Sequence, residues 1–291
     1  MFISDDAISR ELYEIDQQLI VRSVPIQMRP IEATAEFAKR HNIALPLTAP
    51  IPGTYHESYR HWPITNFIME WFDKQYGNRL GVDWGPGKAA FSLRGDPWHF
   101  HFSLFYGKTE FIVSREKSSK ELCQNAGVGV YNILDAVRNF PDGLKQSLTD
   151  DELKYIFDIY LSSYNALSRL EYCKGAKLVG LAKSDIEAAV NHIMASEPEH
   201  GLSKWASLQA TEKILKAVIE KKGGSFGKTH DLDSLTKQLL TVGVQLKISS
   251  EIKSIRCSPG IRYGEEQADL HAAVNAHHAT FSVITKLANH L

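Results

Sequence analysis

The chain has 291 residues, a length that suits one large domain or two domains of ordinary size. Its 33 basic and 34 acidic side chains nearly cancel, which argues against a strongly basic nucleic-acid-binding protein but leaves room for a local basic patch. Apolar residues make up 43% of the sequence and charged residues 23%, the ordinary balance of a globular protein with a sizeable core.

Three cysteines lie far apart in the sequence, at Cys123, Cys173 and Cys257. Neither a disulfide framework nor a zinc site uses so few cysteines at such spacings, so the expected location is a reducing cytoplasm. The N-terminus has neither a basic start nor an apolar run, so we do not expect a signal peptide. No stretch is long and apolar enough to form a transmembrane helix, and no membrane partner is expected.

The first part of the chain combines short helical patterns with one clear β region. Helical spacing of apolar residues predicts helices over residues 4–20, 31–41 and 64–76. Residues 88–114 then predict three strands separated by turns. We expect these strands to form a small antiparallel sheet that packs on the helix at 64–76, so that residues 1–115 form an α+β domain of unknown role.

The middle strand of that β region alternates between aromatic residues and histidines. His99 and His101 share one face of the strand, as paired metal ligands can. A third ligand of the right type is not evident nearby in the sequence, so we expect no metal site. The preferred interpretation is the polar face of a half-exposed sheet.

From residue 115 onward the apolar spacing is helical. Residues 118–140 predict one helix, and two later helices each begin with a capping box, at Thr149 and at Ser184. We expect residues 116–200 to be connecting helices packed on a bundle formed by residues 201–291. The predicted fold class is therefore α+β, with a small N-terminal antiparallel sheet and helices followed by a mainly α-helical C-terminal bundle.

The stretch from Ala206 to Leu240 predicts a helix, a glycine break and a second helix. Apolar residues recur at helical spacing in the first helix, among them Leu208, Leu215 and Val218. Gly223 and Gly224 end this helix, and Thr229 is the predicted N-cap of the next one. Such a short antiparallel pair needs partner helices to bury both of its apolar faces.

The amino-acid sequence of this helix pair resembles the HEPN family. Its members are small four-helix modules of nucleotidyltransferase accessories and RNA-targeting toxins. The matching residues are Gln209-Ala210-Thr211-Glu212-Lys213, Leu215-Lys216-Ala217, Gly223, Lys228-Thr229-His230-Asp231-Leu232 and Leu235, followed by Arg262-Tyr263 before a further helix. The resemblance covers about residues 185–289. It implies a helical bundle that binds a nucleotide or RNA, as a symmetric homodimer in a prokaryotic defence or stress system.

One departure from the family bears on catalysis. RNase members carry an arginine followed, after four to six residues, by a histidine on a late helix, whereas no histidine follows Arg262 at those spacings and His271 comes too late. The resemblance therefore favours a non-catalytic, binding-type member without a cofactor. The first alternative is a divergent metal-independent endoribonuclease that uses Arg262 with His271 or His278. The second is a structural module for oligomerisation or partner binding.

Polar residues gather at helical spacing on the last predicted helix, residues 265–287. Two histidines and an amide on one helix face could bind a phosphate or take up a proton. An arginine just before the helix could also hold a phosphate, and a lysine lies on the basic edge of the glycine loop. The candidate ligand-binding residues are Arg262, Tyr263, His271, Asn275, His278 and Lys228.

Overall fold

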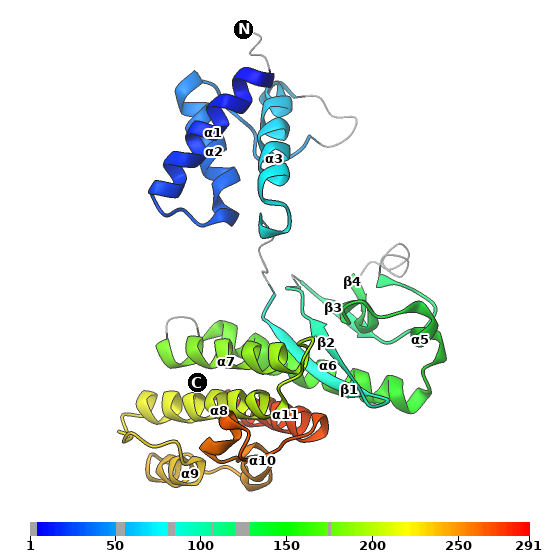
Figure 1. The fold of residues 1–291 in the computed structure, drawn as a ribbon, viewed down its shortest axis with the longest axis vertical. Helices are drawn as coiled ribbons and strands as arrows, with labels where there is room; N and C mark the ends of the chain where they lie inside the picture. The colour runs from blue at the N-terminus through cyan, green and yellow to red at the C-terminus, as the bar shows by residue number, and fades with distance from the viewer. Residues whose placement is uncertain (1–4, 51–55, 81–84, 106, 120–128, 174–175) are drawn as a thin grey trace. The chain divides into compact units, whose positions relative to one another are not determined.

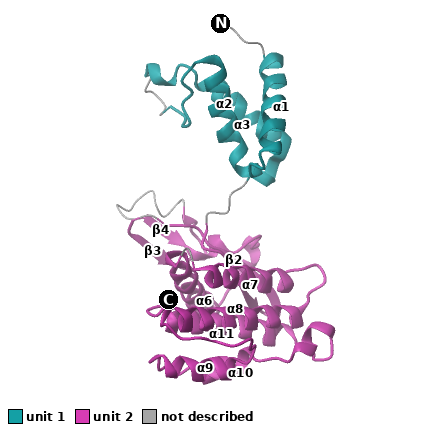
Figure 2. Ribbon diagram, turned by 90° about the vertical axis from the view of Figure 1, so that its left-hand side faces the viewer, with its two compact units in different colours: residues 1–83 teal, residues 84–291 magenta. Residues whose placement is uncertain are grey.

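The computed structural model describes residues 5–50, 56–80, 85–105, 107–119, 129–173 and 176–291. The chain divides into two compact units, unit 1 at residues 1–83 and unit 2 at residues 84–291 (Figure 2). This division differs from the expected boundary at residue 115, because the strands after residue 88 pack with the C-terminal helices. None of the described helices is long and apolar enough to cross a membrane.

Three α-helices make up most of the described part of unit 1 (Figure 1), and their buried apolar residues form one core. They are α1 Asp5–Val21, α2 Arg29–His41 and α3 Trp62–Tyr76, accompanied by the short 3-10 helices η1 Ile26–Met28, η2 Glu57–Tyr59 and η3 Gly77–Leu80. Each α-helix contributes fully buried side chains, such as Leu12, Phe37 and Phe72. The three helices predicted from apolar spacing are confirmed.

A buried polar cluster joins the three helices of unit 1. The carboxylate of Asp16 accepts a hydrogen bond from the Tyr76 hydroxyl at 2.5 Å, and Arg29 donates to the same hydroxyl at 2.8 Å. Burial and the Asp16 carboxylate raise the pKa of Tyr76. Because Asp16 is only 4% exposed, these partners are what make the burial of its charge tolerable.

Unit 2 begins with an antiparallel hairpin of β1 Lys88–Leu93 and β2 Asp96–His101. The two turn residues between the strands, Arg94 and Gly95, have φ values of +54° and +89°, as a tight two-residue hairpin requires. The expected third strand exists as β3 Thr109–Ile112, but it pairs in parallel with β4 Gly129–Asn132 and not with the hairpin. The region thus forms two separate two-stranded sheets among the described residues.

The helix predicted over residues 118–140 is wrong from residue 129 onward. Residues 120–128 lie outside the described part, residues 129–132 form β4, and Ile133–Ala136 form the 3-10 helix η4. The β-branched and aromatic residues of β4, Val130 and Tyr131, favour an extended backbone beside β3. The apolar spacing alone did not reveal this pairing.

The remainder of unit 2 is a helical bundle in which α7, α8 and α11 lie side by side (Figure 1). Its elements are α5 Asp142–Ser147, α6 Asp150–Tyr172, α7 Lys177–Ile193, α8 His200–Lys221, α9 Leu232–Thr241, α10 Ser249–Ile255, the 3-10 helix η5 Pro259–Tyr263 and α11 Leu270–Leu287. The combination of small sheets with this bundle confirms the predicted α+β class.

Local signals marked some helix ends correctly and others not. The capping box at Thr149 is present, and Gly223, with φ +77°, follows the end of α8 as predicted. Ser184 lies inside α7, where its hydroxyl bonds the Gly180 carbonyl, so the second capping box is wrong. Asp231 caps α9 in place of Thr229. Asp269 caps α11, which begins at Leu270, five residues after its predicted start.

The hairpin is covered by helices of its own unit. Phe91 stacks on Phe100, and Phe100 contacts Tyr160 of α6 edge to face at 5.3 Å between ring centres. On the other face, Ala90 packs against apolar residues of α7 and α11. The hairpin therefore lies at the centre of unit 2.

Candidate functional site

Two adjacent histidines of α11 bind the backbone of β1 at Ala90. The Ala90 N–H donates to His277 Nε2 at 3.2 Å, and His278 Nε2 donates to the Ala90 carbonyl at 2.8 Å. Burial and the neighbouring His278 lower the pKa of His277 to about 3, and burial also lowers the pKa of His278. Both imidazoles are therefore neutral near pH 7 and have opposite tautomers. They provide the hydrogen-bond partners of the Ala90 N–H and carbonyl at the outer edge of β1.

The polar residues expected to share one face of the last helix separate in the structure. His271 and Asn275 are exposed, and the Asn275 amide nitrogen lies 3.1 Å from Nδ1 of His271. His278 instead bonds β1 and lines a pocket of about 220 Å³ together with Tyr155 and Phe281. The structure thus places His278 in the framework that holds the hairpin.

The family-like residues of α8 and the following loop converge on Glu212. Its side chain, 6% exposed, accepts from Lys216 Nζ at 2.7 Å, His230 Nδ1 at 2.8 Å and Gln209 Nε2 at 3.2 Å. Three donors around one buried carboxylate offset the loss of its hydration. These residues therefore fix the loop before α9 to α8, and Lys228 lies exposed in that loop.

Arg262 lies on η5 beside two aromatic rings. Its guanidinium carbon is 4.5 Å from the ring centre of Trp205 on α8 and 5.2 Å from that of Tyr263. Tyr263 is 73% exposed, and Arg262 forms no ion pair with any residue that the structure describes. Nε of Arg262 donates to the Pro259 carbonyl at 3.4 Å, and the aromatic contacts leave the Nη N–H groups available at the edge of the guanidinium.

Arg262 borders a polar pocket of about 360 Å³ at the start of α8. The pocket is lined by Pro198, Glu199, His200, Gly201, Leu202, Ile261, Arg262, Gly264, Glu266, Gln267 and Ala268. The side chain of Glu199, the N-cap residue of α8, forms no capping hydrogen bond. Its carboxylate therefore does not occupy the N–H groups of the first turn. This "Arg262 pocket" thus combines a cation with backbone donors.

Both carboxylates that line the Arg262 pocket have partners. Glu199 bonds His192 Nδ1 at 3.1 Å, and Glu266 accepts the Ser258 N–H at 2.8 Å. That backbone bond lowers the pKa of Glu266. Neither Trp205 nor the pocket-lining His200 was a candidate from the sequence, because only the packing of η5 on α8 brings them to Arg262.

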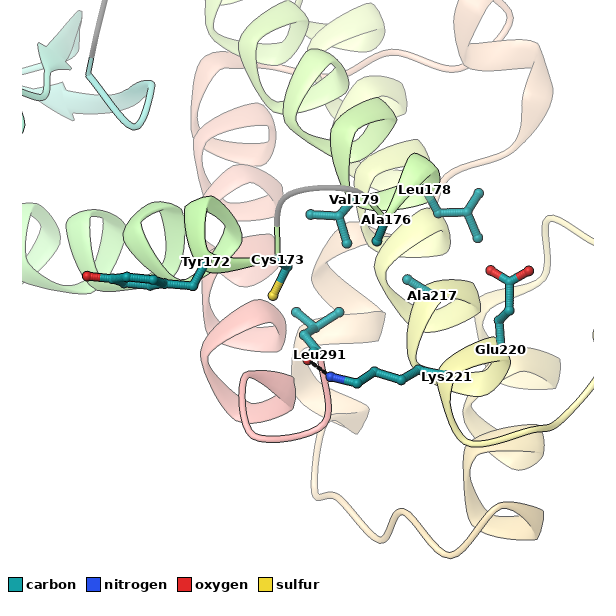
Figure 3. Close-up of a pocket in the computed structure, with 9 residues that line it drawn as sticks. All are labelled: Tyr172, Cys173, Ala176, Leu178, Val179, Ala217, Glu220, Lys221 and Leu291. Atoms are coloured by element: carbon teal, nitrogen blue, oxygen red, sulfur yellow. Dashed lines mark hydrogen bonds between the residues drawn. The ribbon is translucent and has the colours of Figure 1, made fainter.

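Another pocket, of about 340 Å³, lies where the ends of α6 and α8 meet the last residue of the chain (Figure 3). Its walls include Leu178, Val179 and Ala217, and Figure 3 shows Lys221 reaching Leu291, whose carbonyl oxygen accepts a hydrogen bond from Nζ. The sequence-predicted site residues lie outside this pocket. In the described part of the chain, no group of three His, Cys, Asp or Glu side chains is placed to hold a metal ion.

Comparison with known proteins identifies the helical part of unit 2. The model of the HEPN domain matches residues 177–259, which run from the start of α7 to the start of η5. No curated protein and no solved structure matches the chain. The matched segment contains the Glu212 cluster and ends just before Arg262. The resemblance seen in the sequence is confirmed: the C-terminal part of the chain matches the HEPN domain.

Proposed function

We propose that unit 2 is a non-catalytic binding module that holds a nucleotide or RNA at the Arg262 pocket. The HEPN match is consistent with a nucleotide- or RNA-related function. The observation that carries the proposal is Arg262 beside Trp205 and the exposed Tyr263 at the rim of a polar pocket. Phosphate suits a guanidinium, and an unstacked base suits an exposed aromatic ring.

The arrangement assigns a part of the ligand to each group. Arg262 would contact a phosphate through its Nη N–H groups, and the first-turn N–H groups of α8 would face the same charge. Tyr263 would stack on a base, an interaction that tolerates different sequences. His271 and His278 do not line this pocket, so they have no part in this contact.

A titration with fluorescently labelled 12-nucleotide single-stranded RNA, read by anisotropy, tests the proposal, and a mononucleotide competitor separates the two ligand sources. Arg262→Ala should weaken binding roughly 10- to 100-fold, since a charged hydrogen bond contributes about 1.5–3 kcal/mol. The matched control is Arg10→Ala, which removes an exposed arginine of unit 1. Equal affinity of Arg262→Ala and wild type for all probes would overturn the assignment.

One observation favours the endoribonuclease alternative: His200 lines the same pocket as Arg262. An imidazole there could accept the proton of a ribose 2′-hydroxyl. Incubating RNA with the protein in chelator tests this. Cleavage that is lost in both His200→Ala and Arg262→Ala would establish catalysis. Intact RNA would leave binding without catalysis as the proposed function.

The remaining expectations stay predictions. The homodimer and the role in a prokaryotic defence or stress system come from the family resemblance, and the cytoplasmic location comes from cysteine usage. Sedimentation of the purified protein checks the dimer directly. A monomer that still binds RNA would remove the dimer from the proposal without touching the Arg262 pocket.

A further inference from the structure

The second strand of the hairpin has neighbours on both sides. His99 of β2 is the register partner of Ala90 on β1. On the other side, Phe100 forms a bridge with Val137, and the Arg138 N–H donates to the His99 carbonyl at 3.1 Å. Continuing that antiparallel bridge by one residue places Arg138 directly opposite His99. Residues opposite one another in antiparallel strands project from the same face.

The same face carries two further basic groups. His101 lies two residues along β2 from His99 and therefore projects to the same side, and Lys88 is the register partner of His101. Four groups that are or can become cationic thus lie within two neighbouring rows of the sheet. We call them the hairpin row: Lys88, His99, His101 and Arg138.

The members of the hairpin row differ in how far they are engaged by the protein. Lys88 is paired with Glu187 of α7 at 3.1 Å. Arg138 is exposed and forms no ion pair within the described residues. Nδ1 of His99 is buried and has no hydrogen-bond partner among the described residues. Within the described part of the chain, the row therefore holds an exposed guanidinium without an ion pair beside a half-buried imidazole whose Nδ1 has no hydrogen-bond partner.

Electrostatics shows that these groups affect one another. Burial is the main cause that lowers the pKa of His99, and the charges of Lys88, His101 and Arg138 lower it further. Glu187 of α7 is the acidic group paired within the row, and His277 and His278 of α11 face the Ala90 side in neutral form. An anion placed among these groups would remove the repulsion that disfavours protonated His99.

We propose that the hairpin row binds a phosphate group of an RNA strand, which makes it a second anion site outside the segment that matches the HEPN domain. The proposal rests on the proposed function and names RNA as the ligand. A phosphodiester offers several oxygen acceptors around one centre, which suits a forked guanidinium together with imidazole and ammonium donors. RNA carries such groups in series, so one strand can supply a phosphate here and another at Arg262.

The sign of the pH dependence follows from the same contacts. In the free protein the pKa of His99 is lowered, so His99 is neutral at pH 7, and a bound phosphate would favour its protonated form. RNA binding should therefore be accompanied by proton uptake and should tighten as the pH falls from 8 to 6. The other charged groups next to the row are Lys88 and its partner Glu187 of α7, which lie 3.1 Å apart.

The test measures binding of labelled single-stranded U12 at pH 6 and pH 8, with uridine monophosphate as a second probe. Arg138→Gln should weaken RNA binding roughly 5- to 30-fold and reduce the slope of affinity against salt by about one ion. His99→Gln should reduce the difference between the two pH values. Arg10→Gln is the matched control, since it removes an exposed arginine from unit 1.

The outcomes separate this inference from the proposed function. Unchanged RNA affinity in Arg138→Gln and in Lys88→Gln, together with a loss in Arg262→Ala, would overturn the hairpin row and leave the Arg262 pocket standing. Uridine monophosphate weakened as strongly as U12 by Arg138→Gln would overturn RNA as the ligand of the row. Circular dichroism of each variant shows whether it has folded, and His99→Asn replaces His99→Gln if the latter has not.

Discussion

Two pairs of histidines lie on either side of Ala90, and they are used in different ways. His277 and His278 on α11 are held by the Ala90 backbone, with the pKa of both lowered by burial. His99 and His101 project from β2, where His99 is partly buried beside basic side chains. Nδ1 of His99, like Nδ1 of His277, has no hydrogen-bond partner among the described residues. The first pair completes a strand edge, and the second pair lies beside Arg138, which forms no ion pair with the residues that the structure describes.

This difference shows that the role of a histidine follows from its hydrogen-bond partner and not from its spacing in the sequence. His277 and His278 are neighbours in sequence, yet one accepts from the Ala90 N–H and the other donates to the Ala90 carbonyl. Their neutral, fixed tautomers suit a structural role. The pKa of a partly buried imidazole among cations instead rises when an anion binds nearby.

Removal of the His277 imidazole should have the largest effect on stability. His277→Ala leaves the Ala90 N–H without its acceptor and opens a cavity in the core, which together cost about 3 kcal/mol. Hydrogen–deuterium exchange of the peptide containing β1 reports on unit 2 alone and should show much faster exchange. His271→Ala on the exposed face of the same helix is the control, and equal exchange in the two variants would contradict the role of His277.

The pH dependence of stability should be the next largest effect. The pKa of His277 is lowered from 6.5 to about 3 in the folded state, so below pH 6.5 the unfolded chain binds protons that the folded chain does not. Stability is therefore complete above pH 6.5 and declines as the pH falls, by about 1.4 kcal/mol per pH unit for one such group.

Urea denaturation at several pH values between 6.5 and 5 measures this slope before the carboxylates begin to protonate. His277→Gln keeps an acceptor for the Ala90 N–H but does not titrate, so its slope should be smaller than that of wild type. Identical slopes in the two proteins would mean that His277 does not govern the acid sensitivity.

The elements that could be predicted from sequence are those specified by nearby residues. The capping box of Thr149 and Glu152 depends on bonds across three positions, and the end of α8 depends on Gly223 in a left-handed conformation. The parallel pairing of β3 with β4 depends on residues far apart, so local spacing suggested a helix there. Long-range pairing is the step that apolar periodicity does not contain.

The candidate site shows the same limit. Arg262 and Tyr263 were predictable from the resemblance to the family, and in the structure both are exposed and in contact with each other. His278 was grouped with His271 by helical spacing, but its partner is the Ala90 carbonyl, 188 residues earlier in the chain. Trp205 and His200 reach Arg262 only through tertiary packing, so no pattern near residue 262 could reveal them.

A third histidine sharpens the comparison because it is both exposed and paired. The side chain of His230 is 69% exposed, and its Nδ1 bonds the buried Glu212, which keeps Lys216 and Gln209 as further donors. His230→Ala should therefore cost only about 1 kcal/mol. Urea denaturation measures this loss, and a cost as large as that of His277→Ala would show that Glu212 depends on this one donor.

The smallest expected effect on stability belongs to Arg138. Its side chain is exposed and forms no ion pair with a described residue, so Arg138→Gln should change the free energy of unfolding by no more than about 0.5 kcal/mol. Urea denaturation beside wild type measures the change, and exchange of the β1 peptide should stay the same. Arg94→Gln is a useful contrast, because Arg94 binds Glu152 through two hydrogen bonds of 2.7 and 2.8 Å and ties the hairpin to α6. A loss for Arg138→Gln as large as that for Arg94→Gln would mean that Arg138 serves the fold, and the contrast between engaged and available basic groups around the hairpin would no longer hold.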